Sequence, residues 1–267
     1  MTQIALLGAA HIHTPGFIKR IKDRTDVKVK SVWDHDTERA KKRADELGCS
    51  VQKSLGKIFG DPEINGVVVC SETNLHKKLV LAAADAKKHM FVEKPLGMGG
   101  KDGYAMAEAI EKAGVIFQTG YFSRGNPVNL FLREQIKLGN FGTITRVRGS
   151  NCHAGSLKGW FDTEWRWMAD PKIAGCGAFG DLGTHSLDIL LWLTAEVEAV
   201  TGTIETGTAR YPGCDEFGEA LIKFKNGVVG TLQICLFALD FPQEDLEMGI
   251  VGDGGVLQTR ISQIEIL

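Results

Sequence analysis

The chain has 267 residues, 43% of them hydrophobic, and its 31 basic and 33 acidic side chains give a formal net charge of -2. This composition excludes a disordered or fibrous protein, and the balanced charge offers no broad field to attract nucleic acid or an anionic membrane. At this length a single hydrophobic core stops growing, so two domains and a small or neutral partner are expected.

The first half of the chain alternates short apolar strands with helices, which predicts a doubly wound parallel sheet. Thr37 is a plausible N-cap and Gly48 a plausible C′ residue of the second helix. The expected strands are 3–8, 27–34, 66–71, 89–95 and 115–121, and the expected helices are 15–25, 37–48, 75–88 and 102–114.

Beyond Tyr121 the pattern changes to one dominated by strands. A helix over 126–139 is predicted, with Asn126 as its N-cap and Pro127 at its first position. Strands follow over 143–153, 197–209, 216–237 and 246–260, with a hairpin at Asn226-Gly227 and one helix over 181–194. Strands without intervening helices favour an antiparallel sheet. We therefore expect two domains, 1–122 and 123–267.

Six scattered cysteines form no Cys-x-x-Cys pair, so neither a disulfide framework nor a zinc site is predicted. The N-terminus has no basic region before its apolar run, and no apolar stretch approaches the roughly 20 residues of a membrane span. These patterns favour a cytoplasmic protein that does not bind a membrane.

The loop after the first strand favours a dinucleotide cofactor, because a helix N-terminus there can hold a pyrophosphate. Its residues Gly8, Ala10, His11 and Ile12 stand where G-x-G-x-x-G is expected, with Ala10 in place of the second glycine. His11 and His13 could also ligate a metal, but no third ligand lies at a recognisable spacing, so no metal is expected.

Asp34 ends the second strand, where a carboxylate can accept hydrogen bonds from the adenosine ribose. The same charge would repel a 2′-phosphate, which favours NAD over NADP, although Lys41 and Lys42 leave NADP open. The alternative is that Asp34 is a solvated residue at the entry of the next helix.

Asp181 and His185 are four residues apart, so on the predicted helix they share one face. An ionised Asp181 could orient His185 as a general base for a substrate hydroxyl. A capping acid and a satisfied histidine are the alternative reading.

The segments FVEKPLG at 91–97 and GCGAFGDLGTH at 175–185, the second after WRWMADP, resemble the Gfo/Idh/MocA family of NAD(P)-dependent oxidoreductases over nearly the whole chain. The resemblance implies an N-terminal Rossmann domain and a C-terminal α+β domain with an open, mostly antiparallel sheet. It also implies that Lys94 is the catalytic lysine, that Asp181 and His185 form the substrate-site pair, and that Glu93 and Pro95 shape the turn beside the cofactor.

The sequence departs from the family pattern in two further places. The usual T-P-x-x-x-H is here Ser71-Glu72-Thr73-Asn74-Leu75-His76, which keeps Ser71 and His76 on the cofactor side but puts Glu72 near the cofactor edge. Family members also continue for tens of residues past the position of Leu267, so a closing strand and helix, and with them the expected homo-oligomer interface, are in question.

The resemblance implies hydride transfer between NAD(P) and a secondary hydroxyl of a sugar, polyol or sugar derivative. His185 would remove the hydroxyl proton while Lys94 stabilises the alkoxide. Residues that line a sugar pocket, or else only pack, are Tyr121, Arg124, His153 and Trp167. Two alternatives remain: an NAD-dependent glycoside hydrolase acting by transient oxidation and elimination, and a non-catalytic cofactor-binding regulator.

Overall fold

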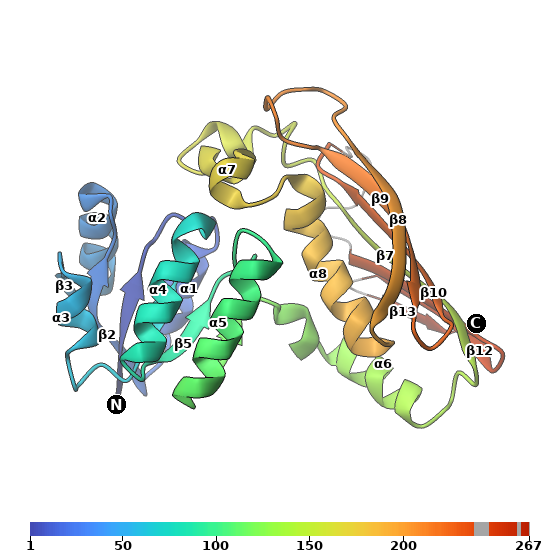
Figure 1. The fold of residues 1–267 in the computed structure, drawn as a ribbon, viewed down its shortest axis with the longest axis horizontal. Coiled ribbons are helices and arrows are strands. Elements are labelled where there is room, and N and C mark those ends of the chain that lie inside the picture. The colour runs from blue at the N-terminus through green and yellow to red at the C-terminus, as the bar shows by residue number, and fades with distance from the viewer. Residues whose placement is uncertain (238–245, 261–262, 267) are drawn as a thin grey trace. The chain divides into compact units, whose positions relative to one another are not determined.

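The computed structural model describes residues 1–237, 246–260 and 263–266. Its contacts divide the chain into two compact units, which are 1–120 with 172–175, and 121–171 with 176–267 (Figure 1). The short return of 172–175 to the first unit lies in α7 (Pro171–Ala174) and the glycine after it, and no sequence pattern predicts it.

The first unit is built on a six-stranded sheet in the order β3-β2-β1-β4-β5-β6, in which every pairing is parallel. Its strands are β1 (Thr2–Leu7), β2 (Val27–Trp33), β3 (Ser50–Val51), β4 (Gly66–Val69), β5 (His89–Val92) and β6 (Phe117–Thr119). The predicted Rossmann topology is confirmed, and the direction of winding reverses on either side of β1, where such sheets bind their ligands.

Helices cover both faces of this sheet. They are α1 (Thr14–Lys22), α2 (Thr37–Leu47), α3 (Leu55–Phe59), α4 (Thr73–Asp85) and α5 (Gly100–Ala113). One core joins Leu79 of α4 and Met106 of α5 to the sheet, and a second joins Ala40 and Ala44 of α2 to the opposite face. Burial of the apolar stripe of each helix therefore drives the doubly wound arrangement.

The ends of α2 show how local chemistry sets a helix. Asp36, not the predicted Thr37, is the N-cap, because its carboxylate accepts hydrogen bonds of 3.0 Å from the amides of Glu38 and Arg39. Thr37 is the first helical residue. Gly48 ends the helix in the left-handed conformation, as predicted, with φ of 63°.

The second unit holds a seven-stranded sheet in the order β13-β12-β11-β7-β10-β9-β8. Its strands are β7 (Ile144–Cys152), β8 (Val197–Glu205), β9 (Phe217–Phe224), β10 (Val229–Cys235), β11 (Leu246–Gly252), β12 (Gly255–Arg260) and β13 (Gln263–Ile266). All described pairings are antiparallel except that of β7 with β10, so the predicted antiparallel sheet is mixed. Asn226 and Gly227 form the predicted hairpin between β9 and β10.

Two long helices accompany this sheet. In α6 (Pro127–Lys137) the predicted N-cap is confirmed, since the Asn126 side chain accepts from the Val128 amide at 2.9 Å. The second helix, α8 (Ala178–Leu193), begins three residues before the predicted start and lies along β7 and β10. Short 3-10 turns, η1 (Phe122–Gly125), η2 (Trp160–Asp162) and η3 (Arg166–Ala169), complete the unit.

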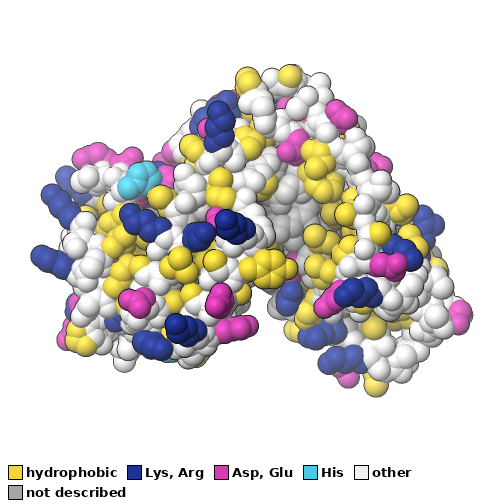
Figure 2. Space-filling model, in the orientation of Figure 1, with side chains coloured by type: hydrophobic (Ala, Val, Ile, Leu, Met, Phe, Trp, Pro, Cys, Tyr) yellow, Lys and Arg dark blue, Asp and Glu magenta, His cyan; other side chains and the backbone are white. Residues whose placement is uncertain are grey.

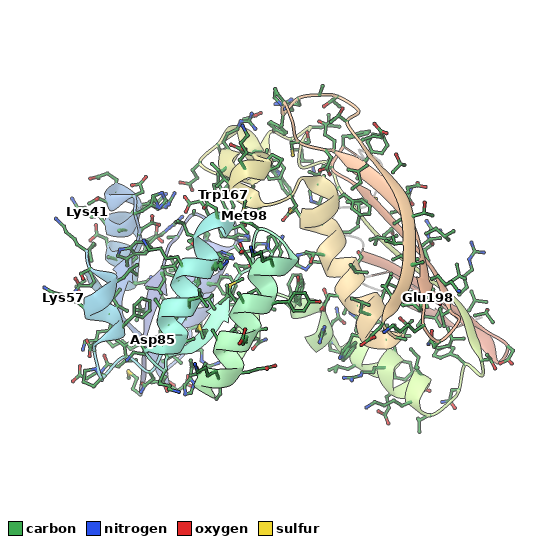
Figure 3. The ribbon with its side chains drawn as sticks, viewed as in Figure 1. Lys41, Lys57, Asp85, Met98, Trp167 and Glu198 are labelled. Atoms are coloured by element: carbon green, nitrogen blue, oxygen red, sulfur yellow. The ribbon has the colours of Figure 1, made fainter. Side chains whose placement is uncertain are left out.

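The surface agrees with the near-zero net charge, since basic and acidic side chains are interspersed on the face drawn in Figure 2. Lys41, one of the two lysines for which NADP stays possible as the cofactor, is an exposed residue of α2 (Figure 3). Within the described part of the chain, no helix combines the length and apolar character that crossing a membrane requires.

Candidate active site

The loop after β1 is held tightly by its own backbone. Gly8 has a φ of +73°, and a Cβ there would lie 2.4 Å from Cβ of Ser71, so only glycine fits. The amide of Ala9 donates to Oδ2 of Asp34 at 2.8 Å, and that of His11 donates to the Cys70 carbonyl at 3.0 Å. Two of the amides expected to meet a pyrophosphate are therefore committed within the protein.

The loop enters α1 at His13, the N-cap of the helix. The first turn of α1 contains no acidic residue, but the carboxylate of Glu93 lies 3.0 Å from Nδ1 of His13. Ala10 and His11 are buried, whereas Ile12 is half-buried and His13 is exposed.

Asp34 is buried rather than solvated, which excludes the alternative reading of this residue. Its Oδ2 accepts from the Ala9 amide and from Nε of Arg39 at 2.7 Å. Its Oδ1 accepts from the Asp36 amide at 2.9 Å and from Nη2 of Arg39 at 2.7 Å. With four donors on one carboxylate, a ribose hydroxyl has to displace a bond or bind to Arg39 instead.

Arg39 is a member of this site that sequence reasoning missed. Besides its two bonds to Asp34, its Nη2 donates to Oε1 of Glu72 at 2.8 Å. Burial lowers the pKa of Arg39, but the bonds to Asp34 and the charges of Asp34 and Glu72 outweigh this effect and raise it. The departure at Glu72 thus has a structural consequence, because it supplies a second carboxylate to Arg39.

Ser71 and His76 hold this edge of the sheet together from inside. Both side chains are fully buried. Nδ1 of His76 lies 3.0 Å from the Pro95 carbonyl and Nε2 lies 3.2 Å from the Ser71 carbonyl. Burial lowers the pKa of His76, so the neutral ring donates to one carbonyl at a time. The His76 side chain therefore links the segments that follow β4 and β5.

The FVEKPLG segment contains the last two residues of β5 and the turn that follows them. Glu93 and Lys94 are both buried, and the Lys94–Pro95 peptide bond is cis. Oε2 of Glu93 accepts from the Lys94 amide at 2.9 Å, and a Cβ on Gly120 would lie 2.6 Å from that oxygen. The Glu93 carboxylate thus shapes the turn that presents Lys94, which is the role that the family resemblance implies.

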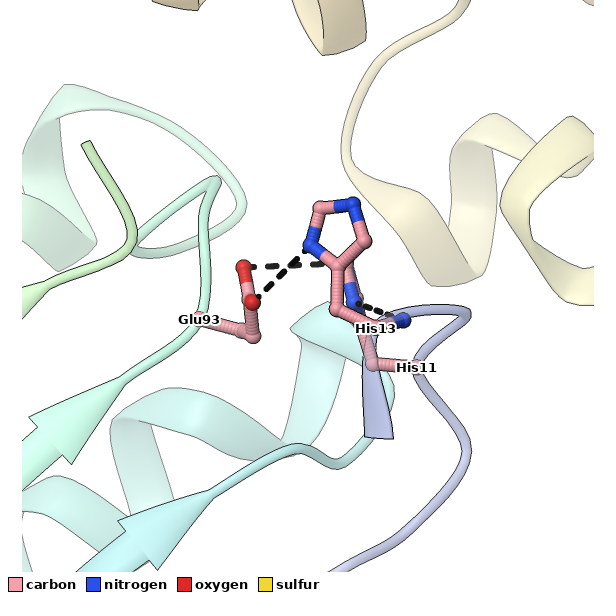
Figure 4. A group of neighbouring side chains, drawn as sticks. All are labelled: His11, His13 and Glu93. Atoms are coloured by element: carbon pink, nitrogen blue, oxygen red, sulfur yellow. Dashed lines mark hydrogen bonds and ion pairs between the residues drawn. The ribbon is translucent and has the colours of Figure 1, made fainter. Parts of the chain in front are cut away.

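Glu93 also meets the two histidines of the first loop (Figure 4). Its Oε1 lies 3.0 Å from Nδ1 of His13 and its Oε2 lies 3.9 Å from Nε2 of His11. The ligand atoms of the three residues all lie within 4.8 Å of one another. Sequence spacing did not supply a third metal ligand because Glu93 is 80 positions from His13, and the fold brings it there.

The hydrogen bonding of this cluster disfavours a metal. The amide of His13 donates to Nδ1 of His11 at 3.2 Å, which places the proton of a neutral His11 on Nε2, the atom that faces Glu93. A metal ligand needs the opposite tautomer, with its remote ring N–H donated to an acceptor. The three residues therefore fit a hydrogen-bonded group that holds the loop.

In the second unit, α8 carries the predicted Asp181 and His185. His185 is buried, and its ring centroid lies 6.1 Å from that of Tyr121 and 5.5 Å from that of Phe122. Tyr121 in turn shares a 2.7 Å hydrogen bond with Thr184. Asp181 lies half-buried in the first turn of α8 and lines a small cavity. Phe122 and Thr184 were missed, although each adjoins a predicted residue.

The other predicted substrate residues have partners of their own. Arg124 forms a two-point ion pair with Asp188, with Nε to Oδ2 at 2.8 Å, and this bond raises the pKa of Arg124. His153 accepts from the Gly155 amide at 2.9 Å and packs on Trp160 with ring centroids 5.0 Å apart. Trp167 is half-buried in η3 (Figure 3).

Comparisons with known proteins identify the family. Residues 2–121 match the family described as oxidoreductase family, NAD-binding Rossmann fold, and residues 130–258 match the GFO/IDH/MocA C-terminal domain. The chain belongs to the Gfo/Idh/MocA oxidoreductase family. The predicted fold class is thereby confirmed, and the first unit is an NAD-binding Rossmann domain.

Individual relatives are moderately similar. A levoglucosan dehydrogenase of Pseudarthrobacter phenanthrenivorans is 29% identical over 198 residues, 66% of this chain and 50% of that protein. A 2,7-anhydro-N-acetylneuraminate hydratase of Escherichia coli is 28% identical over 205 residues, 74% of this chain and 53% of that protein. The chain thus spans about half the length of these relatives.

A similar fold occurs in the crystal structure of the WlbA dehydrogenase from Bordetella pertussis in complex with NADH and UDP-GlcNAcA. Its TM-score is 0.87 at 23% identity, over 99% of this chain and 76% of that one. This likeness supports the fold.

Proposed function

We propose that this protein is an NAD-dependent dehydrogenase that oxidises a secondary hydroxyl of a sugar, polyol or sugar derivative. The observation that carries the proposal is the buried His185 on α8, which is flanked by the rings of Tyr121 and Phe122 and preceded by Asp181 one turn earlier. An imidazole in such a setting is suited to accept a hydroxyl proton.

The proposed roles follow from the chemistry of each group. His185 accepts the hydroxyl proton, and Asp181 stabilises the resulting imidazolium. Lys94, held at the end of β5 by the Glu93 turn, stabilises the negative charge that develops on the substrate oxygen. NAD, when bound, would accept the hydride that leaves the carbon bearing this hydroxyl. The Ile12–His13 segment would receive the pyrophosphate, and Asp34 with Arg39 would face the adenosine ribose.

Tyr121, Arg124, His153 and Trp167 complete the proposal as substrate residues. The proposed role of Arg124 is to hold the side chain of Asp188, because the two residues form an ion pair. We further propose a cytoplasmic location and a homo-oligomer. The first rests on six cysteines without a disulfide pattern, which form no disulfide among the described residues, and the second on the family resemblance.

The proposal is tested by a screen of sugars and polyols with NAD and NADP, following the absorbance of the reduced nicotinamide. His185→Ala and Lys94→Ala should each lower kcat by about 100-fold or more while cofactor affinity is retained. Unchanged activity in both variants would remove the catalytic assignment, and cofactor binding without turnover of any substrate would favour a regulator.

A second candidate is favoured by the similarity to a hydratase. Transient oxidation followed by elimination and return of the hydride would give a net reaction without redox change, as in an NAD-dependent glycoside hydrolase. The two candidates are separated by the fate of the cofactor. Reduced nicotinamide accumulates in solution in the dehydrogenase, whereas in the alternative product forms without net consumption of NAD.

A further inference from the structure

The guanidinium of Arg39 lies between two carboxylates from different strand ends. Asp34 follows β2 and engages Nε and Nη2, and Glu72 follows β4 and engages Nη2 again. Both N–H groups of Nη2 are thereby used, and Arg39 is mostly buried, with 17% of its side chain exposed. A residue held at three points in this way has a fixed orientation.

The charges of this cluster do not cancel. Asp34 and Arg39 together are neutral, and Glu72 adds one negative charge. Two further ionisable groups adjoin the cluster. Nδ1 of His35 lies 3.3 Å from Oδ1 of Asp34 and its Nε2 lies 3.6 Å from Oε1 of Glu72. The Asp36 carboxylate accepts from the Arg39 amide at 3.0 Å. When His35 is neutral, the cluster is therefore net anionic, and Glu72 is the acid that contacts Nη2 of Arg39 from the end of β4.

We propose that Glu72 is a cofactor-specificity residue that selects NAD against NADP by placing a second carboxylate on the guanidinium of Arg39. This inference rests on the proposed function. An arginine beside the adenosine ribose is the group that would normally bind a 2′-phosphate. Here its Nε and Nη2 donors are held by Asp34 and Glu72, and a phosphate approaching the guanidinium would meet the Glu72 carboxylate as a like charge.

Discrimination of this kind acts through an unfavourable contact with the wrong ligand rather than a better contact with the right one. Neutralising Glu72 should therefore leave NAD affinity almost unchanged. It should strengthen NADP binding, because one negative charge beside the phosphate position is removed. If Glu72 had only a structural role, its loss would weaken both cofactors alike.

The test measures dissociation constants of NAD and NADP directly, by calorimetry, at about pH 8, where histidine side chains are generally neutral. Glu72→Gln should shift the ratio of the two constants about tenfold toward NADP. Glu72→Asp keeps the charge and should keep the wild-type ratio. A ratio unchanged in Glu72→Gln, or shifted equally in Glu72→Asp, overturns the inference.

The matched control is Glu46→Gln, which removes the carboxylate partner of Arg43 on the same helix at 2.9 Å. It should leave the ratio unaltered. If Glu72→Gln does not fold, the salt dependence of NAD and NADP binding to the wild type tests the proposal instead. Raising the salt concentration screens repulsion, so NADP should gain relative to NAD, and a relative loss of NADP contradicts the proposal. Failure of the wild type to bind either cofactor would instead refute the proposed function.

Discussion

The hydroxyl of Tyr121 lies 2.7 Å from the side-chain oxygen of Thr184, the residue immediately before His185. The same Tyr121 places its ring against the His185 imidazole in an edge-to-face contact. Tyr121→Phe removes the hydrogen bond and keeps the ring, so we expect kcat to fall about tenfold from looser orientation of His185. Steady-state kinetics of the variant check this.

Tyr104→Phe is the control for this prediction, because Tyr104 is an exposed tyrosine on α5. It should match the wild type in kcat. Tyr121→Phe should also lower the free energy of unfolding by only about 1 kcal/mol, the value of one hydrogen bond. A much larger loss of stability would attribute its kinetic effect to misfolding.

Gly8 is expected to be intolerant of any side chain. Gly8→Ala would hold alanine at a φ of +73° and place its Cβ 2.4 Å from Cβ of Ser71. We expect the free energy of unfolding to fall by about 2 kcal/mol or more. Urea denaturation of Gly8→Ala beside Gly16→Ala provides the comparison, since a Cβ added to Gly16 in α1 would meet no atom within 4 Å. Gly16→Ala should be neutral or stabilising.

Lys88 is a buried lysine with a structural role. Its Nζ donates to the carbonyls of Asp61 at 2.7 Å and Ile64 at 2.8 Å. Lys88→Met leaves both buried carbonyls without their charged donor, so the free energy of unfolding should fall by about 2 to 3 kcal/mol while NAD affinity is retained. Lys87→Met, which removes one exposed bond to Ala113, should cost much less. Equal losses in the two variants would contradict this assignment.

Glu216 makes stability depend on acidity. Burial raises the pKa of its carboxyl, but bonds from Thr208 and from the amides of Gly207 and Ala209 outweigh this and lower it overall. A carboxyl whose pKa is lowered in the folded state stabilises the protein at pH values above the pKa that this carboxyl has in the unfolded chain. That contribution is lost as pH falls through the folded pKa.

Glu216→Gln should therefore be less stable than the wild type at neutral pH by about 1 to 3 kcal/mol. The difference should shrink as the pH is lowered past the ordinary glutamate value of about 4.3. Chemical denaturation across this pH range measures it, and a difference independent of pH would show that the charge of Glu216 is unimportant.

Local patterns predicted most of the elements. Alternation of apolar runs with helical spacing placed the strands and helices of the first unit except the short β3 and α3, which were missed. Turn chemistry placed Gly48, Asn126 and Gly227 correctly. The cap of α2 was misplaced by one residue, because Asp36 and Thr37 are both good capping residues and the sequence does not show which side chain reaches the amides.

Contacts between segments that are far apart in the sequence were not predicted. Arg39 and Glu72 are 33 positions apart, and His13 and Glu93 are 80 apart, yet parallel strands bring their carboxyl ends to one edge. Local periodicity does not determine the order of strands in a sheet, so neither contact was predicted. The parallel pairing of β7 with β10 was missed for the same reason, since β7 alone reads as an ordinary antiparallel strand.

The position of β7 has a consequence during translation. Its two neighbours, β10 and β11, both follow it far along the chain, whereas all six strands of the first sheet have been made by Thr119. A nascent polypeptide can therefore complete the first sheet while β7 waits with both edges unpaired. Ribosome-bound intermediates of this protein should expose β7 to chaperones until β10 and β11 emerge from the exit tunnel.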